Sequence, residues 1–189
     1  DHYLESLNRA STSTESEDAG RRGGNGDYRF ASAGPAKASF RCGEEKVVRF
    51  AVRRRNPGAG RFSVRCNVVD ERGVTLLQCD SRLTGYRVAP TDLHEGEVVI
   101  RNPWLKPGEY TVDLFVIGEL GVGFIDKFET ACRFQVANVL PYPYSTIPAA
   151  SAEGVVFADF AYADTSAPQA PDAPVVSGQC EPEPEPSLH

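Results

Sequence analysis

The sequence predicts an all-β fold, an antiparallel β-sandwich of jelly-roll or immunoglobulin-like shape. Between residues 27 and 138, short runs rich in β-branched and aromatic residues alternate between apolar and polar positions. Turns rich in Gly, Pro, Asn and Asp separate these runs, and no run repeats with the 3.6-residue period of a helix. Many short strands joined by tight turns are typical of a domain made of two packed sheets.

Eight strands are expected in this region, at residues 27–32, 44–54, 61–70, 74–82, 96–102, 109–118, 122–128 and 131–138. The strand over residues 44–54 places Val48, Phe50 and Val52 on one face, which we expect to lie in the core. The strand over residues 109–118 follows the turn "LKPGEY" and directs a second apolar set inward, made of Tyr110, Val112, Leu114 and Val116. Trp104, between two prolines, is expected to plug the end of this core.

The rest of the chain divides into three segments around the sandwich domain, which we place at residues 27–140. Residues 1–26 are expected to form a short helix over residues 1–10 and a flexible Ser- and Gly-rich linker. Residues 141–164 are read as a Pro/Tyr linker and a ninth strand, and residues 165–189 as a disordered, Pro-rich acidic tail. The ninth strand either returns to its own sheet or exchanges with a second copy. Its dimerisation residues would be Val155, Val156, Phe157, Phe160 and Tyr162.

The length and charge of the chain exclude several classes of protein. A chain of 189 residues fits one domain with tails. The net charge of −6 argues against a nucleic-acid-binding protein, which is expected to carry a basic surface. Because no run of 18 apolar residues is present, we expect no direct insertion into a membrane. The chain begins at Asp1 and contains no Met, so we expect it to be part of a longer protein or a processed product.

The cysteines indicate a reducing compartment. Five are present, an odd number, and no two have the spacing of a CxxC motif. Neither a disulfide framework nor a zinc site is therefore expected. Cys66, Cys79 and Cys132 lie in predicted strands, where a free cysteine behaves as a small apolar residue. We expect the protein to be cytosolic on this ground.

The hairpin around residues 70–73 predicts which side chains of its two strands share a face. If Glu71 and Arg72 are the two central residues of the turn, Arg65 lies opposite Gln78. The apolar face then comprises Phe62, Val64, Cys66, Val68, Thr75, Leu77 and Cys79. The other face of the same hairpin comprises Ser63, Arg65, Asn67, Leu76, Gln78 and Asp80.

Extending this alternation to two further strands predicts a polar face that also carries an aromatic ring. We expect this face to bind a glycan through Arg53, Arg65, Asn67, Gln78, Asp80, Asp113 and Phe115. Amide, guanidinium and carboxylate groups form hydrogen bonds with sugar hydroxyls, and an aromatic ring covers the C–H face of a pyranose. The alternative is a face that is simply solvated. Phe115 favours the first reading, because an exposed Phe within a strand invites cover by a ligand, a loop or another chain.

Little in the sequence supports catalysis. The three histidines are His2, His94 and His189, and the motifs of zinc proteases, P-loop nucleotide hydrolases and dinucleotide-binding folds are absent. Asp80 and Asp113 have the chemistry of a glycoside-hydrolase pair, but a sandwich of about 110 residues leaves little room for a deep cleft. We expect no enzyme activity, no cofactor and no metal site.

Four stretches of the sequence, taken in order, resemble one known family. They are "FRCGEEKVVRFAVR", "VVDERGVTLLQCDSRL", "LHEGEVVIRNPWLKPGEYTVDLFV" and "IDKFETACRFQV". They resemble the C-terminal domain of the ATP-binding subunit of O-antigen polysaccharide ABC transporters, the Wzt type. The resemblance covers residues 40–136, and each motif alone occurs in many sandwich domains.

The resemblance implies a cytoplasmic β-sandwich that binds the exported polysaccharide, often at its modified non-reducing end, during lipopolysaccharide biosynthesis. It implies an upstream ATPase domain and a membrane subunit as partners, at the inner face of the inner membrane of a Gram-negative bacterium. It also implies a homodimer that exchanges a C-terminal strand. Site residues vary with the glycan in this family, so the resemblance does not transfer them. The alternative function is a structural or adhesion-type sandwich that acts through protein contacts.

Overall fold

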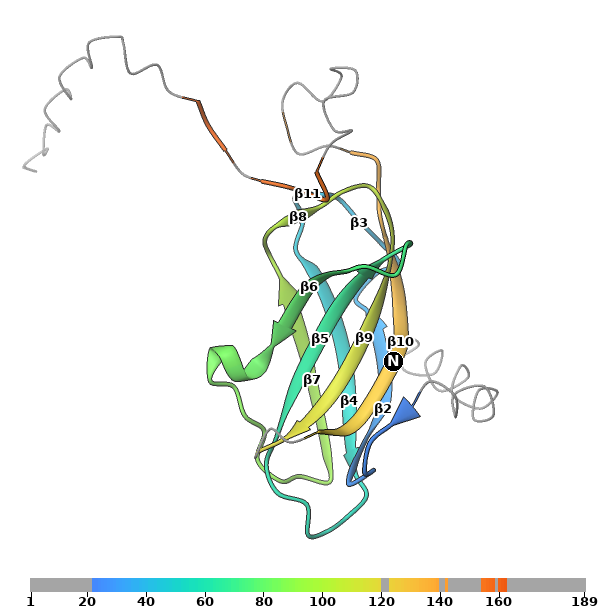
Figure 1. The fold of residues 1–189 in the computed structure, drawn as a ribbon, viewed down its shortest axis with the longest axis vertical. Helices are drawn as coiled ribbons and strands as arrows, with labels where there is room; N and C mark the ends of the chain where they lie inside the picture. Colours follow the sequence, from blue (N-terminus) through green and yellow to red (C-terminus); the bar gives the residue numbers. More distant parts are fainter. Residues whose placement is uncertain (1–21, 120–122, 140–141, 143–153, 159, 163–189) are drawn as a thin grey trace, which may run out of the picture. The chain divides into compact units, whose positions relative to one another are not determined.

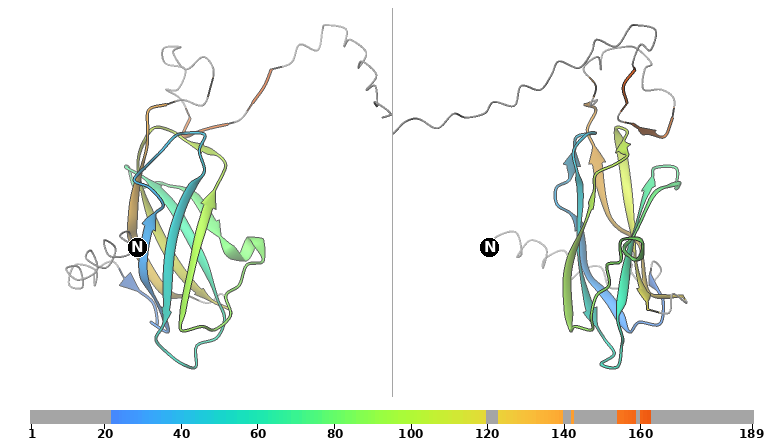
Figure 2. Two further views of the ribbon diagram at one scale, coloured as in Figure 1. Left: turned by 180° about the vertical axis from the view of Figure 1, so that it is seen from behind. Right: turned by 90° about the vertical axis from the view of Figure 1, so that its left-hand side faces the viewer.

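The computed structural model describes residues 22–119, 123–139, 142, 154–158 and 160–162. The chain divides into two units, one ending at Asp159 and one over Phe160–His189. In its described residues, the first unit contains two β-sheets packed face to face (Figures 1 and 2). The predicted all-β sandwich is therefore confirmed. No helix in the described residues is long and apolar enough to cross a membrane.

The larger sheet lies in front in Figure 1 and contains the strands of the candidate site. In spatial order these are β1 (Arg22–Gly23), β10 (Phe124–Val136), β9 (Gly108–Gly118), β5 (Phe62–Asp70) and β6 (Thr75–Asp80). They pair antiparallel, and β3 (Ser39–Phe40) joins the end of β10 in parallel.

The smaller sheet lies behind it and consists of β2 (Tyr28–Pro35), β4 (Lys46–Arg54) and β7 (Leu93–Ile100), with β4 in the middle. A 3-10 helix, η2 (Ser81–Thr84), follows β6 at the start of the connection to β7. A two-stranded ladder, β8 (Trp104–Leu105) with β11 (Val156–Phe157), completes the fold.

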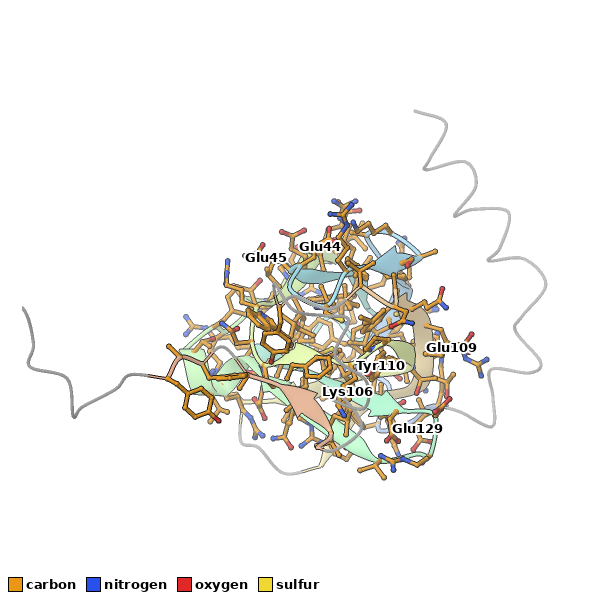
Figure 3. The ribbon with its side chains drawn as sticks, turned by 90° about the horizontal axis from the view of Figure 1, so that it is seen from above. Glu44, Glu45, Lys106, Glu109, Tyr110 and Glu129 are labelled. Carbon is orange, nitrogen blue, oxygen red and sulfur yellow. The ribbon has the colours of Figure 1, made fainter. Side chains whose placement is uncertain are left out.

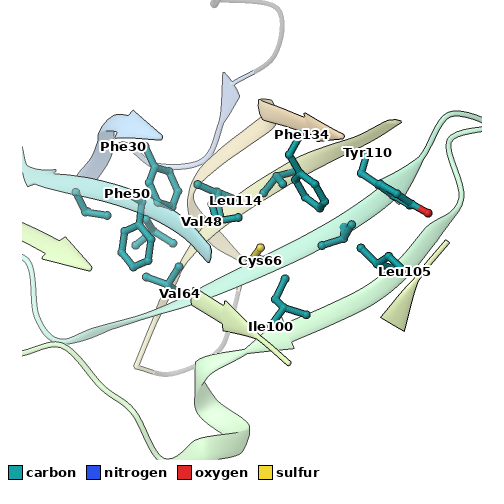
Figure 4. Packing of buried hydrophobic residues seen from close by; sticks show 14 of the residues in the cluster. Phe30, Val48, Phe50, Val64, Cys66, Ile100, Leu105, Tyr110, Leu114 and Phe134 are labelled. Atoms are coloured by element: carbon teal, nitrogen blue, oxygen red, sulfur yellow. The ribbon is translucent and has the colours of Figure 1, made fainter. Parts of the chain in front are cut away.

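The core fills the space between the two sheets, as the alternation of apolar residues predicts. Val48 and Phe50 of β4 face Val64, Cys66 and Leu114 of the larger sheet, and all five are buried (Figure 4). Aromatic rings add edge-to-face contacts, with Phe40 and Phe134 5.5 Å apart between ring centroids. Such contacts stabilise a core beyond the area that they bury.

One strand replaces two of the predicted strands. The segments 122–128 and 131–138 were expected to be separate, but β10 runs without a turn from Phe124 to Val136. The sequence between them forms a β-bulge, since the pairing with β9 shifts register between Phe128 and Cys132. Thr130 takes a left-handed conformation there, with φ of 52°. A bulge keeps a strand continuous while it re-aims the side chains.

The hairpin of β5 and β6 has the predicted faces from Leu77 to Asp80, but not the predicted register. Thr75, expected on the apolar face, is exposed and pairs with Val69 of the outer face. Arg65 is opposite Asp80 and Asn67 is opposite Gln78, two residues further along than expected. The loop holds three residues instead of two, ending in Gly73 with φ of 79°, and a bulge at Leu76 adds one more. Each addition alone would exchange the two faces of β6 relative to β5, and the two additions together restore them.

Asp126 joins the two sheets at one edge. Its side chain is fully buried, at 0% exposure, and points from β10 toward the edge strand β2. One carboxylate oxygen accepts the backbone N–H of Phe30 at 2.8 Å, and the other accepts Arg29 Nη1 at 2.9 Å. The acid therefore satisfies a backbone donor that β2, as an edge strand, offers to no other strand.

Trp104 helps to close one end of the sandwich, as predicted. Its ring centroid lies 5.8 Å from that of Tyr142, which in turn lies 5.6 Å from that of Phe157. Nearby, the Tyr110 hydroxyl donates to the Lys106 carbonyl oxygen at 2.7 Å, and Figure 3 views the molecule from above with both residues labelled. The ninth strand was expected over residues 154–164, whereas its described part pairs only at Val156 and Phe157. The predicted helix at residues 1–10 and tail at 165–189 lie outside the described residues.

His94 lies half-buried at the other edge, among aromatic rings. Its ring centroid lies about equally far from those of Phe50, at 6.1 Å, and Phe62, at 6.0 Å. Its Nε2 lies 3.1 Å from the hydroxyl of Tyr86. Burial lowers the pKa of His94 below the ordinary value of 6.5, because desolvation disfavours the charged imidazolium.

We expect the folded state to lose stability as the pH falls below about 6.5, where an unfolded His94 takes up a proton before the folded one. The loss should end once the pH has fallen below the folded pKa of His94. Urea unfolding between pH 8 and pH 4.5 measures it. In His94→Gln the step should disappear. A step of unchanged size in that variant would contradict the assignment.

Candidate functional site

The outer face of the larger sheet brings together most of the predicted site residues. Figure 1 shows the four strands β6, β5, β9 and β10 side by side, and their register places residues in rows that cross the sheet. One row runs Asp80, Arg65, Phe115, Lys127 from β6 to β10. The next row runs Gln78, Asn67, Asp113. Six of the seven predicted residues thus lie in two adjacent rows of one face.

Arg53 is the exception, and its predicted place on this face is wrong. It lies on β4, in the smaller sheet, paired with Arg29 and Leu93. The alternation along residues 44–54 separated inward from outward positions correctly, but the strand belongs to the opposite layer. Its exposed side chains therefore cover the other side of the sandwich.

Phe115 is not the exposed ring that the sequence predicts. Its side chain is only 5% exposed, because Phe124 and Arg65 cover it. The two phenylalanine rings lie 4.9 Å apart between centroids, and the Arg65 guanidinium carbon lies 4.6 Å from the Phe115 centroid. Phe124, which the sequence analysis did not single out, is the ring at the surface, at 38% exposure. The alternation along the sequence did not indicate Phe124, because it is the first residue of its strand.

Asp80 is held by Arg82, at the start of the 3-10 helix. The Arg82 side chain donates from Nη2 at 2.6 Å and from Nε at 2.9 Å, and its backbone N–H donates at 3.0 Å. These bonds, with smaller help from the charge of Arg65, lower the pKa of the nearly buried Asp80 carboxyl. Asp80 is therefore an anion that is already compensated.

Asp113 supports the bulge in β10. Its Oδ1 accepts the backbone N–H of Thr130 at 2.7 Å. The group that looked like a ligand for sugar hydroxyls is thus at least partly engaged within the fold. Asp80 is engaged as well, through Arg82.

We expect Asp113→Ala to lower the free energy of unfolding by about 1–2 kcal/mol, because the Thr130 N–H loses its acceptor. Asp113→Asn keeps an oxygen at this position and should cost less than half as much. Equilibrium urea unfolding of both variants measures the difference. Equal losses in the two variants would mean that the charge of Asp113, and not its acceptor oxygen, stabilises the bulge.

Three polar atoms of β5 are buried without a hydrogen-bond partner in the described part of the chain. They are Ser63 Oγ, Arg65 Nε and Asn67 Oδ1. All three belong to alternate residues of one strand, so they lie on the same outer face. Buried polar groups in native proteins are nearly always paired, and an unpaired set calls for an explanation such as a ligand or ordered water.

The predicted dimerisation residues fall in both units. Val156 and Phe157 form β11, with Phe157 almost fully buried, and Val155 beside them is exposed. Phe160 and Tyr162 belong to the second unit, where their rings contact each other at 5.8 Å between centroids. In the described residues, no group of three His, Cys, Asp or Glu side chains is arranged to hold a metal ion.

Comparison with known proteins extends the fold assignment. No family model matches the chain, and no curated protein matches it. The fold is similar to that of the C-terminal domain of Wzt. The TM-score with that crystal structure is 0.58 at 12% sequence identity, over 76% of this chain and 87% of the Wzt domain. At this identity the similarity to Wzt concerns the fold alone.

Weaker similarities involve larger proteins. An alkylpurine DNA glycosylase, AlkC of Pseudomonas fluorescens, has a TM-score of 0.38 at 14% identity, over 59% of this chain and 30% of its own. A β-glucosidase of Erythrobacter marinus has a TM-score of 0.37 at 11% identity, over 58% of this chain and 15% of its own. Scores this low carry no inference about this chain.

Proposed function

We propose that this domain is a non-catalytic carbohydrate-binding module that recognises an O-antigen polysaccharide, at its non-reducing terminal region, for export by an ABC transporter. The observation that carries the proposal is the register that brings Arg65, Asn67 and Gln78 together on one face, beside the ring pair of Phe115 and Phe124. The Wzt-like fold and the ordered sequence motifs support the same function.

The chemistry of this face suits a sugar. Arg65 offers N–H donors, and the amides of Asn67 and Gln78 offer both donors and acceptors to vicinal hydroxyls. The partly exposed ring of Phe124 offers a surface for the C–H face of a pyranose.

Titration of the full chain with the O-polysaccharide of its source strain tests the proposal. Isothermal calorimetry should detect binding with a dissociation constant in the range of about 1 µM to 1 mM, or about −8 to −4 kcal/mol. Asn67→Ala and Gln78→Ala should each weaken it by roughly 5- to 10-fold, the equivalent of about 1 kcal/mol per hydrogen bond.

Arg49→Gln provides the matched control, because Arg49 lies on the outer face of the smaller sheet. It should leave the affinity unchanged. Binding that survives the double change Asn67→Ala with Gln78→Ala would rule out this face. If no polysaccharide of the strain binds the wild-type chain, the glycan function is wrong, and a structural or adhesion-type sandwich becomes the better explanation.

The partners proposed for the module are an upstream ATPase domain and a membrane subunit, at the cytoplasmic face of the inner membrane, and a second copy of the chain. The dimer would form by exchange of the segment around β11, whose two residues pair with β8. Removal of the residues beyond Ala149 should then yield a monomer or an insoluble protein, as measured by light scattering. A truncated chain that remains a stable dimer would exclude strand exchange as its cause.

A further inference from the structure

Arg65 occupies the middle of the outer face without an acidic partner. Its Nε is buried and unpaired, and among the described residues it forms no ion pair. It sits between Asp80 on β6 and Phe115 on β9, at the level where all four strands contribute a side chain. A carboxylate lies directly opposite Arg65, so the lack of a partner needs a physical reason.

The charged side chains that neighbour Arg65 are engaged by other groups. Asp80, directly opposite Arg65, accepts the bidentate side chain of Arg82. On the far side of Phe115, Lys127 pairs with Glu129 at 2.6 Å. Asp113 in the next row accepts the Thr130 N–H. Within these two rows, Arg65 is thus the charged side chain that the described residues leave without a hydrogen bond or an ion pair.

The guanidinium is held in place despite having no acid. Its carbon lies 4.6 Å from the ring centroid of Phe115 and 5.0 Å from that of Phe124. Arginine stacks well on aromatic rings while its outer N–H groups stay free to form a fork with two oxygens. A stacked guanidinium is therefore oriented before a ligand arrives, which lowers the entropy lost on binding.

We propose that the glycan bound by this face carries an oxyanion, either a carboxylate or a phosphate ester, and that Arg65 binds it. A neutral polyol would cover Arg65 while leaving its charge uncompensated, which is costly in a partly dry site. A planar or tetrahedral oxyanion matches the fork and compensates the charge. Asn67, about 7 Å along the same face of β5, lies within reach of a hydroxyl of the same sugar. The inference rests on the function proposed above and names the class of sugar.

The test changes the ligand and the protein in turn. The full chain is titrated with the O-polysaccharide of the source strain in three forms: native, with its carboxyl groups reduced to alcohols, and with its phosphate esters removed. One of the two treatments should weaken binding by about 10- to 100-fold, and which one does so distinguishes a carboxylate from a phosphate. Arg65→Gln should weaken binding of the native glycan by a similar factor, and it should leave the affinity for the neutralised glycan almost unchanged.

Arg72→Gln is the matched control, since Arg72 lies in the turn of the same hairpin and pairs with Asp70. It should bind the native glycan as the wild type does. If both treated glycans bind the wild type as tightly as the native form, the oxyanion is excluded while the glycan function stands. The same conclusion follows if Arg65→Gln weakens native and neutralised forms equally. If the native glycan itself does not bind, it is the proposed function that fails. Because the glycan treatments leave the protein unaltered, the test does not depend on the folding of Arg65→Gln.

Discussion

Asp126→Ala should lower the free energy of unfolding by about 3–5 kcal/mol, among the largest losses available to a single substitution in this domain. The carboxylate is fully buried and satisfies the Phe30 N–H and the Arg29 guanidinium at once. Its removal leaves a buried donor and a cation without a partner, and it disconnects the two sheets at this edge. Urea unfolding followed by circular dichroism measures the loss.

Asp92→Ala is the matched control for Asp126. Asp92 also forms an ion pair, with Arg54 at 2.5 Å, but its side chain is 90% exposed. Because water competes for exposed charges, its loss should cost only about 0–1 kcal/mol. If the two substitutions cost the same, the account of Asp126 as a link between the sheets is wrong.

Phe62→Ala should cost about 3–5 kcal/mol through the cavity that it leaves. The Phe62 ring is fully buried, with its centroid 4.4 Å from that of Tyr28 and 6.0 Å from that of His94. Its backbone also exchanges two hydrogen bonds with Val88, in the connection between the sheets. The substitution removes both the free energy gained by burying the ring and the contacts of the ring with Tyr28 and His94.

Phe62→Leu retains most of the apolar volume and should cost clearly less than Phe62→Ala. Leu83→Ala serves as the surface control, because Leu83 is 81% exposed and should change the stability by no more than about 0.5 kcal/mol. Thermal and urea unfolding of the three variants rank them. A loss at Leu83 that equals the loss at Phe62 would show that the surface residue also contributes to packing.

The inward-facing residues could be predicted from the sequence because alternation is a local property. Val48, Val64 and Leu114 lie in the core as their position along each strand requires. The partner of each strand is a non-local property, and the placement of Arg53 failed for this reason. Alternation separates the two faces of a strand, but it does not identify the sheet to which the strand belongs.

The details of the candidate site could not be predicted from the sequence for a related reason. Phe115 was correctly placed on the outer face, but the residues that cover it, Arg65 and Phe124, come from two other strands. The continuity of β10 likewise depends on Asp113, a side chain of the neighbouring strand that accepts a hydrogen bond from the bulge. Contacts between distant segments, and not local propensity, decide both features.

The two single-residue additions in the β5–β6 hairpin constrain how this sequence can diverge. A deletion confined to the loop around Gly73, or one confined to the bulge at Leu76, would turn Gln78 and Asp80 toward the core on re-pairing, or else force β6 to slip, because β9 holds β5 in register. A related sequence that keeps the same faces must therefore lose or gain residues in the loop and in the bulge together. Length variation in related hairpins should come in steps of two residues, and single-residue indels should be purged by selection.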